Sequence, residues 1–344
     1  MSNTLQLLDC TLRDGGQALE NLNKNGIKTE IFTEENRRDI ATLSSKAGID
    51  IIEIGCMSDS YNGLEKFAIY NNIEELSKYM PKKTFENQLY TGLYVDPDTS
   101  LDKIPEYSPE LVEGIRVILR YSELKKSVDY CAGLAKKGYK VFVQPMLTMR
   151  YTDDEIKYLV YEANNMNAYA LYIVDSFGYM NEHDVDRLYN AYAKELDKKV
   201  KIGFHAHNNM ENALINVKYV IENLNSRDTI IDACAVGMGQ GAGNMQTEVI
   251  VDYLNRHLGT KYDFNCILEI CEILDKFRPH DIEAWGYSPV RLIPAVHSVA
   301  YKYAIEMRLH HNMSLVEINN VLSKVPEELR HRYTPENLKK ILNA

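Results

Sequence analysis

Several features that would indicate other classes of protein are missing from this sequence. No CxxC pair occurs among the six cysteines, which lie at scattered positions and mostly in apolar surroundings. Reduced, buried thiols of this kind are typical of cytoplasmic proteins, so we expect a cytoplasmic location. No apolar run reaches the length of a membrane span, and the residues after Met1 do not form a signal peptide.

An excess of basic charge is also missing. The 344 residues include 39 Lys and Arg against 49 Asp and Glu, which gives a net charge of −10. A negative chain repels phosphate backbones and anionic lipids, so we expect neither a nucleic acid nor a membrane as partner. Low-complexity segments are absent as well, and the 45% of hydrophobic residues can build a sizeable core.

Apolar segments that read as buried strands alternate with helical segments along most of the chain. Eight such strands are expected: the run from Leu7, then residues 50–55, 89–95, 114–119, 139–146, 168–175, 200–207 and 229–236. Strands that alternate with helices pair in parallel, and eight units of this length predict a TIM (β/α)₈ barrel. A doubly wound open sheet is the alternative, but no GxGxxG follows the first strand.

The last part of the chain has only helical patterns, interrupted by prolines. We therefore predict a barrel domain over residues 1–258 and a C-terminal helical domain over residues 259–344. Within the barrel, Gly15 and Gly16 are expected to end the first strand in a tight turn. Residues 18–32 are expected to form a loop, Thr33 to cap a helix, and residues 64–79 to contain a further helix.

Arg13 and Asp14 follow the first strand, at the end where barrel enzymes carry their chemistry. A guanidinium beside a carboxylate can polarise an oxygen and hold a cation at once. The alternative is a simple turn, in which Asp14 caps the next segment and Arg13 pairs with it.

Two histidines, His205 and His207, end the seventh strand. Side chains alternate along a strand, so both imidazoles point to the same face. The first, seventh and eighth strands are neighbours in a closed barrel, which brings Asp14 to these histidines. Two imidazoles and a carboxylate form a divalent-metal site with open positions, and Asn244, after the glycine loop 237–243, is placed to add an oxygen. We expect Mn²⁺, with Mg²⁺, Co²⁺ and Zn²⁺ as other possible ions.

Glu53 and His297 have two possible roles each, whereas Cys234 and His310 have one. Glu53 ends the second strand and is either a substrate or base group or a buried partner of Arg13. His297 lies among apolar residues and is either catalytic or a core histidine. Cys234 is expected in the core, and His310 on a solvated helix surface.

Three sequence blocks now support a family resemblance: LLDCTLRDGG, HAHNN and GMGQGAGN. In this order they resemble the signature blocks of the metal-dependent pyruvate aldolase and Claisen-condensing superfamily. The resemblance implies that Asp14, His205 and His207 are metal ligands, with Asn244 as a further or outer ligand. It also implies that Arg13 polarises a keto oxygen and stabilises an enolate.

Two other segments resemble the aldolase branch of that superfamily. Residues 175–178 resemble its DSxG motif, which implies that Ser176 orients pyruvate. Residues 285–291, with His297 beyond them, resemble its tail motif. Two positions depart from the branch: Gln17 stands where those aldolases have a catalytic histidine, as in lyases and condensing enzymes, and Arg291 stands where they have a tyrosine.

The resemblance is closest to 4-hydroxy-2-oxovalerate aldolase-like proteins. It implies a divalent-metal-dependent carbon–carbon lyase that works through a pyruvate-type enolate, with a small 2-keto acid as substrate and a homodimer as assembly. A Claisen-type acyl-CoA condensing enzyme of the isopropylmalate synthase kind, or an HMG-CoA lyase-like enzyme, is the alternative. A non-enzymatic barrel with a vestigial site is the third hypothesis. The candidate catalytic residues are Arg13, Gln17, Glu53 and His297, and the candidate substrate-binding residues are Arg13, Ser176 and Arg291.

Overall fold

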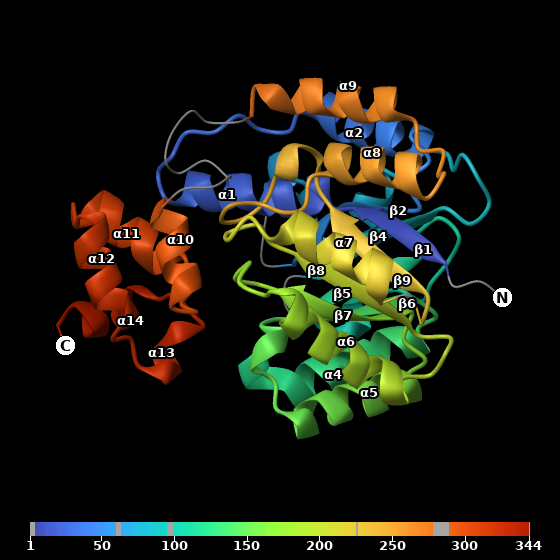
Figure 1. The fold of residues 1–344 in the computed structure, drawn as a ribbon. Helices are drawn as coiled ribbons and strands as arrows, with labels where there is room; N and C mark the ends of the chain where they lie inside the picture. The colour runs from blue at the N-terminus through green and yellow to red at the C-terminus, as the bar shows by residue number, and fades with distance from the viewer. Residues whose placement is uncertain (1–3, 60–62, 95–98, 225, 278–288, 344) are drawn as a thin grey trace.

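A closed barrel of eight parallel strands forms the centre of the molecule (Figure 1). The computed structural model describes residues 4–59, 63–94, 99–224, 226–277 and 289–343. The strands follow one another around the barrel in chain order, and β1 closes it by pairing with both β9 and β2. The strands are β1 (Leu5–Asp9), β2 (Ile51–Met57), β4 (Leu89–Tyr94), β5 (Gly114–Leu119), β6 (Lys140–Pro145), β7 (Ala170–Asp175), β8 (Lys201–Ala206) and β9 (Thr229–Ala233). The predicted TIM barrel is confirmed.

The strands are apolar because both of their faces are covered. Every residue of β2, β4, β7 and β9 is buried, as expected when side chains fill the barrel on one face and helices pack on the other. A short strand, β3 (Ile69–Tyr70), pairs with the end of β2 and adds to the eight. The eight predicted strands correspond to the eight that close the barrel.

The start of the chain differs from the prediction. Gly15 and Gly16 do not form a tight turn: β1 leads into a π-helical turn, η1 (Thr11–Gly15), and directly into α1 (Gly16–Lys24). The predicted loop over 18–32 is therefore wrong in its first part. A Cβ on Gly16 would lie 2.0 Å from the carbonyl oxygen of Phe67, so glycine is needed here for close backbone approach rather than for a turn.

The predicted helix at Thr33 is confirmed, and the helical segment predicted at 64–79 is confirmed only in its last part. Thr33 caps α2 (Glu34–Lys46) in a reciprocal capping box with Asn36. Between β2 and β4 the chain instead forms a short 3₁₀ turn, the strand β3 and the brief α3 (Ile73–Ser77). Ala68 adopts a left-handed conformation, with φ of 52°, and this interrupts a continuous helix.

The remaining helices cover the barrel and extend past it (Figure 1). They are α4 (Leu124–Lys136), α5 (Asp153–Asn165), α6 (Glu182–Glu195), α7 (Ala213–Asn223), α8 (Thr247–His257), α9 (Phe264–Asp275), α10 (Pro289–Val296), α11 (Lys302–His310), α12 (Leu315–Leu322), α13 (Glu327–Arg330) and α14 (Pro335–Leu342). None of the helices among the described residues is both long and apolar enough to cross a membrane.

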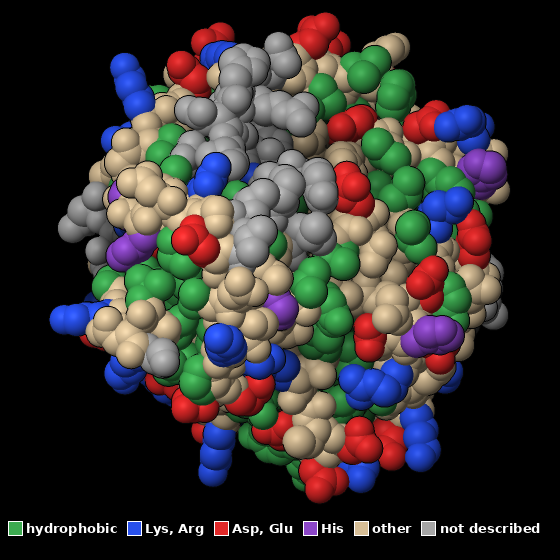
Figure 2. All heavy atoms as spheres, turned by 60° about the vertical axis from the view of Figure 1, so that its left-hand side comes forward, with side chains coloured by type: hydrophobic (Ala, Val, Ile, Leu, Met, Phe, Trp, Pro, Cys, Tyr) green, Lys and Arg blue, Asp and Glu red, His purple; other side chains and the backbone are tan. Residues whose placement is uncertain are grey.

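The C-terminal helices have a hydrophobic core of their own. Helices α10 to α14 share a cluster built around Tyr303, Met307 and Ile318, separate from the barrel core. Helix α9 instead packs on α2 and α8, and its inner side chains belong to the barrel core. This packing favours a division between α9 and α10 over the predicted one at residue 258. On the face that carries the C-terminal helices, acidic and basic side chains are interspersed (Figure 2).

Candidate metal centre

The C-terminal ends of the strands carry a compact group of polar side chains. Arg13 and Asp14 lie on η1, directly after β1, and both are buried. The guanidinium Nη1 of Arg13 lies 3.1 Å from Asp14 Oδ1 and donates to Gln17 Oε1 at 3.2 Å. Arg13 therefore pairs with Asp14, as the alternative of a simple turn expected, but Asp14 does not cap α1, whose N-cap residue is Gly15. Both charged groups line the cavity at the barrel mouth.

The two histidines reach Asp14 from β8 and the residue after it. His205 Nε2 lies 3.7 Å from Asp14 Oδ2, and the two imidazole rings are 5.0 Å apart. One ligand atom from each of Asp14, His205 and His207 falls within 4.8 Å of the others. A carboxylate and two imidazoles at this spacing could hold a divalent metal ion.

Asn244 completes the group. Its amide nitrogen donates to Asp14 Oδ2, while its Oδ1 is buried and has no hydrogen-bond partner among the described residues. A Cβ on Gly239 would lie 2.1 Å from the Asn244 amide nitrogen and 3.1 Å from Asp14 Oδ2. Glycine in this loop therefore lets the backbone pass close over both side chains. An unpartnered amide oxygen beside a carboxylate and two imidazoles fits a divalent ion.

Burial and the neighbouring charges set the protonation of this group. Burial raises the pKa of Asp14, but Arg13, the two histidines and Asn244 outweigh it and bring the pKa to about 2. Burial and the adjacent His205 lower the pKa of His207 to about 4. Burial also disfavours charge on His205, but its hydrogen bonds to Asp232 and Cys10 raise its pKa to about 9. At neutral pH Asp14 is ionised and His207 offers a free lone pair, as a metal ligand requires, whereas His205 holds a proton that a bound metal ion would displace.

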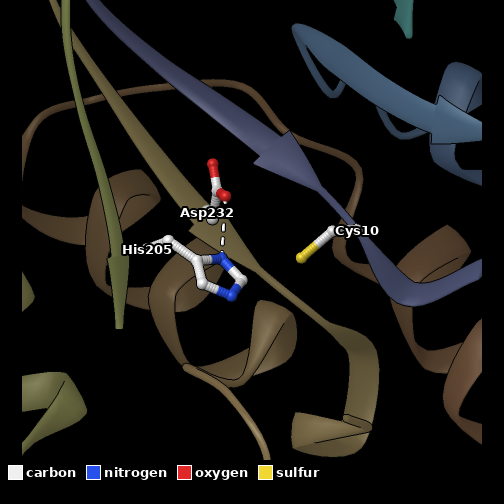
Figure 3. Close-up of side chains that lie close together, drawn as sticks. All are labelled: Cys10, His205 and Asp232. Atoms are coloured by element: carbon white, nitrogen blue, oxygen red, sulfur yellow. Dashed lines mark hydrogen bonds and ion pairs between the residues drawn. The ribbon is translucent and has the colours of Figure 1, made fainter. Parts of the chain in front are cut away.

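His205 has two further neighbours (Figure 3). Its Nδ1 lies 2.8 Å from Asp232 Oδ2, so the carboxylate fixes the imidazole from the side opposite Asp14. The thiol of Cys10, at the end of β1, points toward the same ring. Cys10 also lies against Cys234, with 3.1 Å between the two sulfur atoms, and Cys234 is fully buried as predicted.

A cavity of about 210 Å³ opens beside this group. Its polar wall includes Arg13, Gln17, Ser176 and the Asp14–His205–His207 cluster, so the structure brings these predicted residues together. Ser176 Oγ accepts the amide proton of Leu147 at 2.9 Å, which leaves its own hydroxyl proton available to a ligand. The apolar part of the lining includes Leu93, Ile118, Met146, Leu147, Val174 and Phe177.

Three predicted residues do not line this cavity. Glu53 is buried behind Arg13, with its Oε2 2.9 Å from Arg13 Nε, so the structure favours a buried partner over a base. His297 is turned toward α12, where its Nε2 lies 2.9 Å from Asn319 Oδ1. Arg291 lines a smaller neighbouring cavity between α1 and the C-terminal helices. Residues 285–288 of the predicted tail motif lie outside the described residues.

Several cavity residues were not predicted from the sequence, among them two polar ones in the C-terminal helical region. Tyr301 and His331, both in the C-terminal helical region, line the same cavity as Arg13. The Tyr301 hydroxyl donates to Gln240 Oε1 at 3.3 Å, and burial raises the pKa of Tyr301 to about 12. Neither residue belongs to a recognisable motif, because tertiary packing alone brings this region to the barrel mouth.

Comparisons with known proteins agree with this geometry. A family model described as HMGL-like matches residues 114–275. A 4-hydroxy-2-oxovalerate aldolase from Geobacillus genomosp. 3 is 31% identical over 281 residues, which cover 78% of this chain and 76% of that protein. One from Carboxydothermus hydrogenoformans is 29% identical over 282 residues, 79% of this chain and 77% of that protein. The N-terminal domain of a proposed aldolase from Bacteroides vulgatus has the same fold, with a TM-score of 0.72, 24% identity, and coverage of 92% of this chain and 99% of that one.

Proposed function

The chain belongs to the HMGL-like family, and we propose on that basis that it is a divalent-metal-dependent aldolase acting on a small 2-keto acid. The proposed reaction makes or breaks a carbon–carbon bond through a pyruvate-type enolate, as in a 4-hydroxy-2-oxovalerate aldolase. The predicted resemblance to this family is confirmed. One observation carries the proposal: Arg13 and the Asp14–His205–His207 cluster face the same cavity of about 210 Å³.

The metal would be held by Asp14, His205 and His207, with Asn244 Oδ1 as a further ligand. When bound, a divalent ion polarises a keto oxygen as a Lewis acid. We propose Mn²⁺, with Mg²⁺, Co²⁺ and Zn²⁺ as other candidates, since imidazole and carboxylate ligands suit all four.

Arg13 stabilises the negative charge that develops on the keto oxygen. Its guanidinium is held from behind by Glu53 and from the side by Asp14, so its orientation is fixed before the substrate arrives. A preorganised cation in a buried site stabilises an enolate without reorganisation. Ser176 and Gln17 offer hydrogen-bond donors on the same wall and orient the substrate carboxylate.

Tyr301 is the group we propose for proton transfer. In the condensation direction, the C–C bond forms from the enolate, and the aldehyde oxygen becomes an alkoxide. The Tyr301 hydroxyl donates its proton to this alkoxide, and the phenolate that remains regains a proton from water. In the cleavage direction the phenolate form takes the proton of the substrate hydroxyl, the C–C bond breaks, and the enolate is protonated by water to give pyruvate. A phenol whose pKa is about 12 stays protonated at neutral pH, as a donor must. Proton transfer is thus assigned to a residue other than Gln17 and Arg291, the two positions at which this chain departs from the aldolase branch.

The proposal also covers the assembly, the location and the domain division of the protein. We propose a homodimer in the cytoplasm, in keeping with the family resemblance and with the six free cysteines. We also propose that the helical region after α9 is a separate C-terminal domain.

The direct test combines metal analysis with an assay for released pyruvate. The metal-loaded protein should cleave 4-hydroxy-2-oxovalerate to pyruvate, and chelation should abolish the reaction. Asp14→Asn and His207→Ala should each lose about one bound ion per chain, because each removes a ligand. His310→Ala, on the exposed face of α11, is the matched control and should keep the ion.

Two results would contradict the proposal. Full metal occupancy in the Asp14→Asn, His207→Ala double variant would refute the metal site. Release of free thiol from acetyl-CoA and a 2-keto acid, with no pyruvate-forming cleavage, would favour the condensing enzyme instead.

A further inference from the structure

The interior of the barrel contains a buried network of charged groups. Barrel interiors are normally filled by branched apolar side chains. Here β5 contributes Arg116, β2 contributes Glu53 and β9 contributes Asp232, and all three are at most 1% exposed. Arg116 is also stacked on the ring of Tyr172, with 5.0 Å between the guanidinium carbon and the ring centroid.

The contacts form a closed ring with the candidate metal centre. Arg116 Nη1 lies 2.7 Å from Glu53 Oε2, and the same carboxylate oxygen lies 2.9 Å from Arg13 Nε. The second terminal nitrogen of Arg116, Nη2, pairs with Asp232 Oδ2. Asp232 Oδ2 in turn lies 2.8 Å from His205 Nδ1. The ring closes where Asp14 approaches both Arg13, at 3.1 Å, and His205, at 3.7 Å. In chain order its members are Arg13, Asp14, Glu53, Arg116, His205 and Asp232.

Such a network is costly as a stabilising device. Burying ion pairs costs desolvation energy that their attraction often fails to offset, so apolar residues of similar size would hold the barrel together equally well. This cost indicates that the ring serves the site rather than the fold.

We propose that Arg116 is a positioning residue that links the metal-binding group to the enolate-stabilising arginine. One arm runs from Arg116 through Asp232 to His205, and holds the imidazole with Nε2 toward Asp14. The other arm runs through Glu53 to Arg13, and aims that guanidinium at the cavity. Arg116 itself does not line the cavity of about 210 Å³, so it acts through these neighbours. The inference rests on the proposed function, since it gives Arg13 and His205 the roles described there.

The two arms predict two separable effects. Asp232→Asn should weaken divalent-metal binding, because carboxylates that orient a ligating histidine typically contribute a factor of ~10–100 in affinity. Glu53→Gln should leave metal affinity nearly unchanged and slow enolate formation. Arg116→Met, which removes the charge at similar length, should do both.

The test is calorimetric titration of the full chain with Mn²⁺, supported by thermal unfolding. Arg116→Met should raise the Kd for Mn²⁺ by ~10–100-fold, and Arg116→Lys should recover part of the loss. Arg227→Met is the matched control, because Arg227 is an equally buried guanidinium whose partners are the backbone carbonyls of Ala193, Leu196, Asp197 and Val200. It should lower the melting temperature but leave the Kd unchanged.

The outcomes separate this inference from the proposed function. If the wild type binds Mn²⁺ and Arg116→Met binds it within twofold as tightly, the positioning role is refuted while the metal site stands. If Arg116→Met does not fold, the Kd of Asp232→Asn for Mn²⁺ is measured instead. An unchanged Kd in Asp232→Asn would refute the arm that runs from Arg116 through Asp232 to His205. If the wild type binds no divalent ion, the proposed function and this inference both fall.

Discussion

Neighbouring residues in the chain can carry quite different tasks, and Arg13 and Asp14 show how. Both side chains leave the same π-helical turn. Asp14 turns toward His205 and Asn244, whereas Arg13 is held by Glu53 from behind and borders the cavity. The extra residue in a π turn rotates successive side chains differently from an α-helix, and such turns are frequent at functional sites. The local backbone thus places the group proposed to bind a cation beside the group proposed to bind an oxyanion.

Tyr301 allows a prediction at the level of one oxygen atom. Tyr301→Phe removes the proposed proton donor and should slow aldol cleavage by about 100-fold, the lower end for loss of a general acid or base. Mn²⁺ affinity should be unchanged, and the rise of the cleavage rate with pH, which follows the phenolate form of Tyr301, should disappear.

Tyr303→Phe is the matched control for this prediction. Its hydroxyl donates to the backbone carbonyls of Leu329 and Arg332 within the C-terminal helices, away from the cavity. The control should keep the wild-type rate. An unchanged rate and pH profile in Tyr301→Phe would show that another group moves the proton.

Asp175 gives a prediction for stability against pH. It is fully buried, and burial raises its pKa from the usual 3.8 to about 7, although it accepts the amide protons of Tyr179 and Met180. Because the folded state binds this proton more tightly than the unfolded state, Asp175 contributes stability below pH 4 that is lost as the pH rises to 7.

Asp175→Asn cannot ionise, so its stability should lack this slope. Between pH 5 and 8, the free energy of unfolding of the variant should improve relative to the wild type by about 2–3 kcal/mol, at ~1.4 kcal/mol for each pKa unit. Urea unfolding at the two pH values measures this difference. Parallel pH dependences for the two proteins would show that Asp175 is not the titrating group.

Among single elements, the segment β1–η1–α1 depends on a close approach between the backbones of Gly16 and Phe67. Gly16 begins α1 where the carbonyl of Phe67 passes, with room for a hydrogen but not for a Cβ. Gly16→Ala should therefore destabilise the protein by about 2–3 kcal/mol and displace η1 with its two charged residues.

Gly26→Ala is the control for Gly16→Ala. Its Cβ would meet nothing within 4 Å, and its cost should be about 1 kcal/mol, from its φ of +81° alone. The comparison is made by chemical unfolding together with Mn²⁺ titration. Equal costs in the two variants would contradict the close-approach argument.

Strands of this barrel could be predicted from sequence, while the surrounding detail could not. A buried strand is a local run of apolar residues, so all eight segments stood out. Helix α1 is polar and rich in Asn, and its pattern resembles that of a loop. The ligand cluster was predictable because strand ends in a closed barrel meet at one rim. Arg116 and Asp232 left a weaker signal, a single charged residue inside an otherwise apolar strand.

At the scale of the whole molecule, the C-terminal helices complete the site. Arg150 of the barrel forms an ion pair with Glu327, with 2.8 Å between Nη1 and Oε1. It also donates from Nη2 to the backbone carbonyl of Ser298 at 3.1 Å. This contact lies beside the cavity to which Tyr301 and His331 contribute. Arg150 and Ser298 lie 148 positions apart in the chain, and a contact at such a separation cannot be recognised in local sequence patterns. For this reason the sequence predicted the candidate metal-binding residues but not Tyr301 and His331.

Pyruvate bound in this cavity is proposed to form an enolate. Hydrogen exchange at the pyruvate methyl group measures enolate formation most directly. Metal-loaded protein is incubated with pyruvate in heavy water, and the mass of the recovered pyruvate is determined. Deuterium should enter the methyl group without any aldehyde, and none should enter after chelation of the metal. Arg13→Ala should slow the exchange by about 10²–10³-fold, while Arg38→Ala on the exposed face of α2 should not. No exchange above the buffer rate with metal-loaded wild type, or equal exchange by Arg13→Ala, would show that Arg13 and the metal group do not stabilise an enolate here.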